Sequence, residues 1–105
     1  MTKTVIVSRH GGAILWLKIR GIDGTVYPAW KNENISLLNK GDVVVGNLPL
    51  TMISKILESG ATFGLLNLPE VPLEKRGVEL TPEELTTFGA NVMEIKGIQI
   101  GGKLA

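Results

Sequence analysis

The stretch VIVSRHGGA, residues 5–13, decides how the rest of the chain is organised. Its first part, Val5–Val7, is three β-branched apolar residues in a row, which is typical of a parallel strand covered on both faces. Gly11 and Gly12 follow, and because neither carries a Cβ atom, we expect a sharp turn and a close approach of the backbone to a bound group. A helix is predicted from Ala13. The stretch therefore predicts a strand–turn–helix unit of an α/β domain.

Three polar residues, Ser8, Arg9 and His10, lie where this strand is predicted to end. Open α/β sheets bind ligands outside the carboxyl ends of their strands. The N-terminus of the following helix adds free backbone N–H groups and the positive end of the helix dipole. We therefore expect an anion-binding site at this turn, which also holds the single histidine of the chain.

The remaining sequence alternates between strand and helix patterns. The helix over residues 13–20 is apolar on most sides, so we expect it to be largely buried, against the sheet and, in an oligomer, against a second subunit. We predict strands at 25–27, 41–46, 62–66 and 91–95 (prolonged over 97–100), one or two helical turns at 34–38, helices at 49–59 and 81–88, and a loop at 70–80. This order predicts an α/β fold, a single three-layer Rossmann-like domain over residues 1–105 with a mostly parallel sheet of about five strands.

Composition restricts the class of ligand and the cellular setting. The chain of 105 residues has no cysteine, which excludes disulfides and thiolate metal sites and suits a reducing cytoplasm. No segment approaches the length of a membrane span, and the first residues do not form a signal-peptide pattern. Eleven Lys and Arg against ten Asp and Glu give a net charge of +1, without the basic excess of proteins that grip long nucleic acid. We therefore expect a cytoplasmic protein that binds a small anion, and neither a membrane nor long nucleic acid.

Arg9-His10-Gly11 resembles the Arg-His-Gly motif of histidine phosphatases, in which the histidine attacks phosphorus. Those enzymes carry a second essential histidine, and this chain has only one. The chain is also short for that fold. A motif without its partners is a weak match, so we disfavour a phosphatase.

A longer series of motifs resembles the Csx-sixteen family of type III CRISPR-associated proteins. The matching positions, in order, are Val7–His10, Gly12-Ala13, Trp16-Leu17, Gly41–Val44, Gly46, Leu48-Pro49, Arg76-Gly77, Glu79-Leu80 and Thr81–Leu85. They span most of the chain with the order and spacing of the family, although Gly11 and Asn47 stand where proline and threonine are common. The resemblance implies a Rossmann-like nucleotide-sensing fold and a ring nuclease that binds and cleaves cyclic oligoadenylate, with cyclic tetra-adenylate as the expected ring. Such an enzyme switches off antiviral signalling.

The implied reaction suits the residues at the first strand end. A ribose 2′-hydroxyl attacks its own phosphodiester in line and leaves a 2′,3′-cyclic phosphate and a free 5′-hydroxyl, so the protein mainly holds the geometry. We predict that His10 transfers a proton and that Arg9 stabilises charge on the phosphate, without a metal ion or another cofactor. The structural alternatives are that His10 caps the helix and that Arg9 pairs with an acidic neighbour. Ser8 is expected to donate a hydrogen bond to phosphate or to cap the helix.

Further ligand contacts are predicted at the second strand end and in the long loop. Asn47 would bond an adenine edge or a ribose hydroxyl, or close its own turn. Arg76, together with Lys75, would cover the ligand or form a solvated charge pair. The predicted substrate-binding residues are Ser8, Gly11, Gly12, Gly46, Asn47, Leu48 and Arg76.

The other aromatic and acidic candidates have structural interpretations beside functional ones. Trp16 and Trp30 would stack on adenine, but Trp16 within an apolar helix is more typical of a core. Glu83 and Glu84 are assigned to helix capping. A ring of repeated adenylates is best matched by a two-fold homodimer with a shared pocket. The alternative function is a non-catalytic protein that binds the same ligand and sequesters or reports it.

Overall fold

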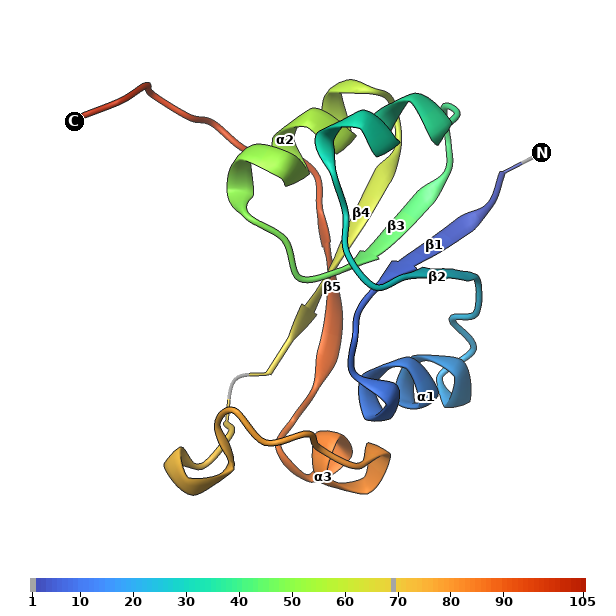
Figure 1. The fold of residues 1–105 in the computed structure, drawn as a ribbon, viewed down its shortest axis with the longest axis vertical. Coiled ribbons are helices and arrows are strands. Elements are labelled where there is room, and N and C mark those ends of the chain that lie inside the picture. Colours follow the sequence, from blue (N-terminus) through green and yellow to red (C-terminus); the bar gives the residue numbers. More distant parts are fainter. Residues whose placement is uncertain (1, 69) are drawn as a thin grey trace.

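The computed structural model describes residues 2–68 and 70–105 of the chain. At its centre is a five-stranded sheet with the strand order β2-β1-β3-β4-β5 (Figure 1). The strands are β1 (Thr4–Val7), β2 (Thr25–Tyr27), β3 (Val43–Gly46), β4 (Thr62–Asn67) and β5 (Asn91–Ile95). The first four run parallel to one another, and β5 runs antiparallel to β4. The predicted order of strands and helices and the mostly parallel sheet are confirmed.

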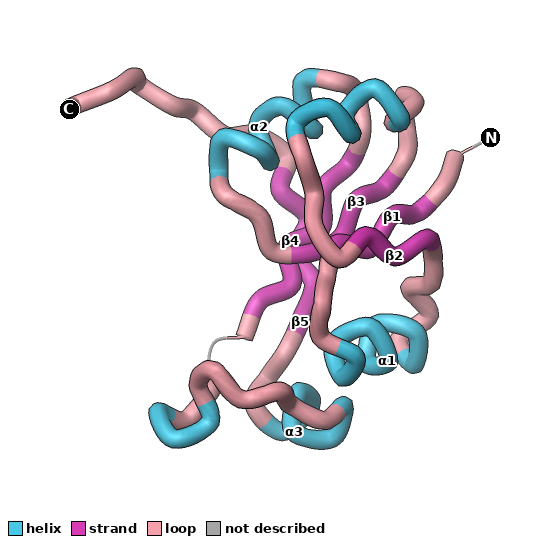
Figure 2. The backbone as a smooth tube through the Cα atoms, viewed as in Figure 1, coloured by secondary structure: helices cyan, strands magenta, loops and turns pink. Residues whose placement is uncertain are grey.

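Helices cover both faces of the sheet (Figure 2). One face is covered by α1 (Gly11–Ile19) and α3 (Pro82–Thr87), and the other by α2 (Leu50–Glu58) and the 3-10 helix η1 (Asn32–Leu37). A second 3-10 helix, η2 (Leu73–Lys75), lies between β4 and α3. Within the part of the chain that the structure describes, no helix has the length and apolar character needed to span a bilayer.

Consecutive residues of β1 contribute to two different cores. Val5 and Val7 belong to the core on the α2 side, which also contains Ile56. Ile6 belongs to the core on the α1 side, which also contains Leu17. This alternation follows from the two-residue period of a strand, and it explains why the three buried residues Val5–Val7 are all apolar. The predicted three-layer α/β fold of the Rossmann-like type is therefore confirmed.

Helix α1 begins at Gly11 and not, as predicted, after both glycines. Gly11 and Gly12 do not have positive φ angles and form the first turn of the helix, so the prediction of a separate glycine turn is wrong. A Cβ atom on Gly12 would lie 1.8 Å from the carbonyl oxygen of Leu80. The close approach that the glycine permits is therefore to the backbone of the protein itself.

The predicted burial of α1 is correct for one side of the helix only. Trp16 and Leu17 are buried, whereas Leu15 and Ile19 are 49% and 67% exposed. Because these two residues are four positions apart, they lie on the same face of the helix. The predicted extension of the last strand over residues 97–100 is wrong, since β5 ends at Ile95.

A buried carboxylate joins the starts of β1 and β3. Asp42 accepts hydrogen bonds from the backbone N–H groups of Lys3 and Asn39, at 2.9 and 2.8 Å, and from the Lys3 Nζ at 2.8 Å. The hydrogen bond from the Lys3 side chain, followed by those from the Asn39 and Lys3 amides, lowers the pKa of Asp42 to about 2. This ion pair fixes the amino ends of the two central strands.

The connections from β1 and β3 leave the sheet on opposite faces. β1 continues through α1 to β2, whereas β3 continues through α2 to β4. Because β1 and β3 are neighbours in the sheet, their carboxyl ends flank a topological switch point. Open α/β sheets leave a crevice for ligands at such a point.

Candidate functional site

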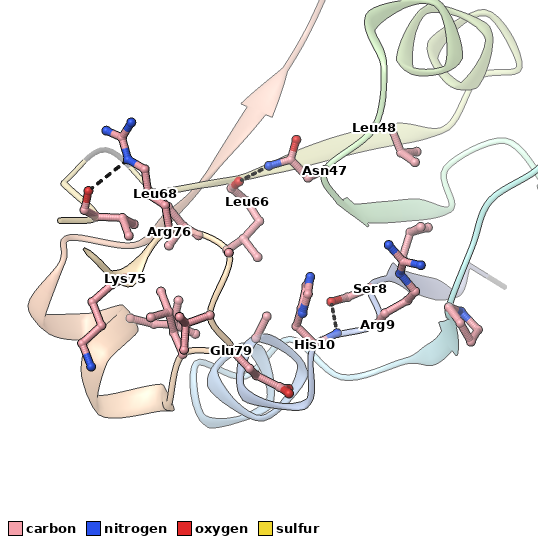
Figure 3. A pocket seen from close by; sticks show the side chains of 18 of the residues that line it. Ser8, Arg9, His10, Asn47, Leu48, Leu66, Leu68, Lys75, Arg76 and Glu79 are labelled. Carbon is pink, nitrogen blue, oxygen red and sulfur yellow. Dashed lines mark hydrogen bonds between the residues drawn. The ribbon is translucent and has the colours of Figure 1, made fainter. Parts of the chain in front are cut away.

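A cavity of about 830 Å³ opens at the switch point. Its lining residues lie mainly at the carboxyl ends of the four parallel strands and in the segments that follow them, with residues 7–10 at the end of β1, 28–30 after β2, 47–48 after β3 and parts of 66–80 at the end of β4 and beyond it. Figure 3 shows these side chains from close by. The lining includes six of the nine predicted site residues, namely Ser8, Arg9, His10, Asn47, Leu48 and Arg76. Two strand ends and the long loop therefore meet at one place, as the strand-end rule requires.

The three predicted glycines do not line the cavity, and each has a structural role nearby. Gly46 pairs with Val7 in the sheet, and a Cβ atom on it would lie 2.5 Å from the carbonyl oxygen of Val7. Gly12 accommodates the Leu80 carbonyl in the same way. These residues let backbone segments pack closely, so that the polar residues beside them reach the cavity.

The ionisable side chains of the lining are mainly cationic. Arg9, Lys75 and Arg76 contribute three positive charges, and Glu79 is the one carboxylate among the described lining residues. Lys75 is also paired with Glu84, with 3.1 Å between Nζ and Oε2. For Lys75 the predicted charge pair is thus present. The charged residues of the lining that are left are Arg9, Arg76 and Glu79, and their net positive charge favours an anionic ligand.

Two amides at the start of α1 bond to the protein itself. The N–H of His10 donates to Ser8 Oγ at 3.1 Å, and the N–H of Gly11 donates to Glu79 Oε1 at 2.6 Å. The contact of Ser8 closes a turn before the helix and does not cap it, because the N-cap residue is His10 and the helix has no side-chain cap. The expectation that these helix-terminal N–H groups are free for a ligand needs correction, because a carboxylate from the long loop already accepts one of them.

His10 and Arg9 extend their side chains from the end of β1 toward the cavity (Figure 3). His10 is the N-cap residue of α1, but its side chain makes no capping hydrogen bond. The alternative in which the imidazole caps the helix is therefore wrong. Arg9 is exposed and points toward the side on which Leu48 lies.

Asn47 and Arg76 each make one contact with backbone. The side-chain amide of Asn47 donates from Nδ2 to the carbonyl oxygen of Leu66 at 3.1 Å and so joins the ends of β3 and β4. Its side-chain oxygen points away from Leu66 (Figure 3). Arg76 donates from Nε to the carbonyl oxygen of Val71 at 3.4 Å, which holds its own loop together.

The two tryptophans have different surroundings. Trp16 donates from Nε1 to Thr86 Oγ1 at 3.1 Å and carries the Arg20 guanidinium 5.0 Å from its ring centre, so it joins α1 to α3 as a core residue. Trp30 lines the cavity and packs edge-on against Tyr27, with 5.4 Å between ring centres. Its buried indole N–H has no hydrogen-bond partner among the described residues.

Two parts of the lining were not predicted from the sequence. Pro28 and Ala29 follow β2 beside Trp30, which was a stacking candidate, and the same strand-end rule applied to that strand would have found them. Glu79 was noticed only as part of a loop motif, because the contact between Glu79 and Gly11 joins residues 68 positions apart. Nothing in the local sequence signals such a contact.

Comparison with known proteins identifies a family. The sequence model of a family described as "Putative CRISPR-associated protein (Cas_VVA1548)" matches residues 5–98. No curated protein and no solved structure matches the chain. Within the described residues, no group of three or more His, Asp or Glu side chains is placed to hold a metal ion.

Proposed function

We propose, from the premise that this chain belongs to the CRISPR-associated family whose model spans residues 5–98, that it is a ring nuclease for cyclic oligoadenylate. The expected ring is cyclic tetra-adenylate, in line with the resemblance to the Csx-sixteen proteins of type III systems. Cleavage would switch off antiviral signalling. The observation that carries this proposal is the cavity at the switch point, lined by Arg9, Arg76 and the Glu84-paired Lys75, with Glu79 as the one carboxylate among the described lining residues. A cyclic nucleotide with several phosphodiesters is a ligand of matching charge.

In the proposed reaction the nucleophile is a ribose 2′-hydroxyl of the ring. It attacks the adjacent phosphorus in line, the bond to the 5′-oxygen breaks, and a 2′,3′-cyclic phosphate remains. His10 takes the proton of the 2′-hydroxyl or returns one to the leaving 5′-oxygen. Arg9 stabilises the charge that develops on the nonbridging oxygens. No metal ion takes part in this scheme.

The ring is proposed to be shared by two protomers. Pockets of a few hundred to about 1,000 Å³ enclose drug-sized ligands. A ring of four adenylates is larger than such a ligand, so the cavity of one protomer would cover only part of it. A two-fold homodimer would place Ser8–His10 and Asn47 of both protomers around one ring.

A non-catalytic binding protein is the second candidate, and the surroundings of His10 favour it. A catalytic histidine is usually oriented by a carboxylate or carbonyl that accepts its second N–H group. Among the described residues, the imidazole of His10 makes no such hydrogen bond. The same cavity would then sequester the nucleotide or report it to a partner protein.

Incubation of the purified protein with cyclic tetra-adenylate in excess EDTA separates the two candidates. We expect linear di-adenylate with a cyclic phosphate end, resolved by chromatography. His10→Ala should lower the cleavage rate by about 10²- to 10⁴-fold if the imidazole transfers a proton. Arg9→Ala should lower both the rate and the affinity because the charge lies at the phosphate.

Arg20→Ala is the matched control for Arg9→Ala, since Arg20 contacts Trp16 and does not line the cavity. It should cleave at the wild-type rate. Tight binding with the ring intact after many hours would contradict cleavage and support the non-catalytic candidate. Unchanged cleavage by His10→Ala would remove the proton-transfer role and leave catalysis to positioning alone.

A further inference from the structure

The carboxylate of Glu79 holds the first amide of α1. Its Oε1 lies 2.6 Å from the backbone nitrogen of Gly11, a short contact that is typical of a hydrogen bond to an ionised acceptor. The adjoining residue, Leu80, packs its carbonyl against Gly12. The segment between β4 and α3 is thereby fastened to the start of α1 by one charged contact and one steric contact.

The rest of the cavity is built for a negatively charged group. Arg9 at the end of β1 and Arg76 in the long segment line it, as does Lys75, whose charge is paired with Glu84. Glu79 contributes the one negative charge of the described lining. A carboxylate and a phosphodiester share the chemistry that matters here, because both are anions that accept hydrogen bonds from N–H groups at a helix N-terminus.

We propose that Glu79 occupies, in the free protein, the place that a ligand phosphodiester takes on binding. The incoming phosphodiester accepts the Gly11 N–H, and the Glu79 side chain turns away from it. The exchange moves the Glu79 carboxylate away from the phosphodiester, because the two negative charges would otherwise repel each other. This inference rests on the proposed function for the identity of the ligand, but the exchange of one anion for another does not depend on cleavage.

The exchange makes Glu79 a residue that determines specificity. A ligand must replace a charge-assisted hydrogen bond before it reaches the Gly11 amide, and a neutral nucleoside cannot form a hydrogen bond of equal strength there. An anion that also contacts Arg9 forms a charge-assisted hydrogen bond to Gly11 and gains a second interaction with the guanidinium. Glu79 therefore selects for phosphodiesters over uncharged nucleosides of the same shape.

The test compares Glu79→Gln with Glu74→Gln, which removes the same charge from the same segment. Glu74 is exposed and does not line the cavity. Calorimetry with cyclic tetra-adenylate should show affinity raised about fivefold to tenfold by Glu79→Gln, because a neutral amide holds the Gly11 N–H less tightly than a carboxylate does. Glu74→Gln should bind as the wild type does, and adenosine should not gain affinity from either substitution.

The amide resonance of Gly11 reports the contact directly by NMR. In the free wild type we expect its proton far downfield, as in a short hydrogen bond, and in Glu79→Gln we expect it to move upfield. Addition of the cyclic nucleotide should shift this resonance in both proteins. If the nucleotide binds but leaves the Gly11 resonance in place, or binds no more tightly to Glu79→Gln, the exchange is refuted and the proposed function still stands.

Inorganic phosphate distinguishes the remaining case, in which the cyclic nucleotide fails to bind at all. That result refutes the proposed function. The exchange is then supported if phosphate shifts the Gly11 resonance at lower concentration in Glu79→Gln than in the wild type. It is refuted if phosphate leaves that resonance unchanged in both proteins.

Discussion

At the scale of single residues, the two neighbouring glycines of α1 have unequal importance. Both are helical, so neither is required for an unusual φ angle. Gly12 is required because the Leu80 carbonyl oxygen occupies the space of a side chain. Gly11 faces only Glu79 Oε1, which would lie 3.5 Å from a Cβ atom, an ordinary contact.

Gly12→Ala is expected to destabilise the protein by about 1–3 kcal/mol, because the new methyl group forces the Leu80 backbone away from α1. Gly11→Ala is the matched control and should be neutral or stabilising by up to about 1 kcal/mol, since alanine is a better helix former. Urea denaturation measures both. If Gly12→Ala were as stable as the wild type, the backbone at Leu80 would be able to move away from α1 without a loss of folding free energy.

The residues of the site were predictable to the extent that they follow strands. Ser8, Arg9, His10 and Asn47 come directly after buried apolar runs, and parallel strands bring such positions together. The hydrogen bonds of these residues were not predictable, because Asn47 and Glu79 contact partners 19 and 68 positions away. The local sequence predicts at which strand end a side chain lies, but it does not predict the distant residue with which that side chain forms a hydrogen bond.

At the scale of the elements, capping residues predicted the start of a helix better than glycines did. The predicted capping role of Glu84 is confirmed by a capping box at the start of α3, with Glu84 N donating to Thr81 Oγ1 at 3.2 Å and Thr81 N donating to Glu84 Oε1 at 3.1 Å. The Thr81 amide, followed by the Lys75 side chain, lowers the pKa of Glu84. The start of α1 was mispredicted because paired glycines suit a turn locally, whereas here they serve a contact with a distant segment.

The ion pair between Lys3 and Asp42, which joins the starts of β1 and β3, makes the stability of the fold depend on pH. The pKa of Asp42 is lowered from 3.8 to about 2 in the fold. A lowered pKa means that the folded protein binds fewer protons than the unfolded chain does. The stabilisation that the Asp42 carboxylate gives to the folded state is therefore present above about pH 4 and is lost as the pH falls toward about 2.

Asp42→Asn should lower the melting temperature at neutral pH by several degrees, because a neutral amide replaces the carboxylate that pairs with the Lys3 ammonium. The difference from the wild type should shrink as the pH falls through the same interval, followed by thermal unfolding at several pH values. Asp23→Asn is the control, since Asp23 is exposed and bonds only within its own turn. A gap between wild type and Asp42→Asn that stays constant with pH would refute the assignment.

At the scale of the whole molecule, the strand order β2-β1-β3-β4 could not be predicted from the sequence. Alternating strands and helices predict a parallel sheet with layers on both sides. Which strand lies centrally depends on which face each crossover takes, and the buried sequence of β1 is compatible with several orders. The switch point beside β1, and with it the location of the cavity, emerges only from the assembled sheet.

The proposed homodimer predicts that the exposed face of α1 matters for association. Ile19 is 67% exposed and lies on the same helix face as Leu15. Ile19→Lys should convert a dimer into a monomer in sedimentation experiments at micromolar concentration. Leu37→Lys is the matched control, because Leu37 is 48% exposed but belongs to η1 on the opposite layer, near the start of β1. A monomeric wild-type protein would contradict the dimer outright.

The direction of β5 determines where the molecule can be attached to something else. Because this last strand runs against the other four, the chain comes back to the end of the sheet at which β1 starts. Figure 1 shows the start of β1 and the C-terminal residues on one side of the molecule and α1 and α3 on the other. A fluorophore, an immobilising tag or a fused reporter at either terminus therefore sits at the end of the sheet opposite the cavity, and surface-tethered protein would keep its ligand entrance facing solution.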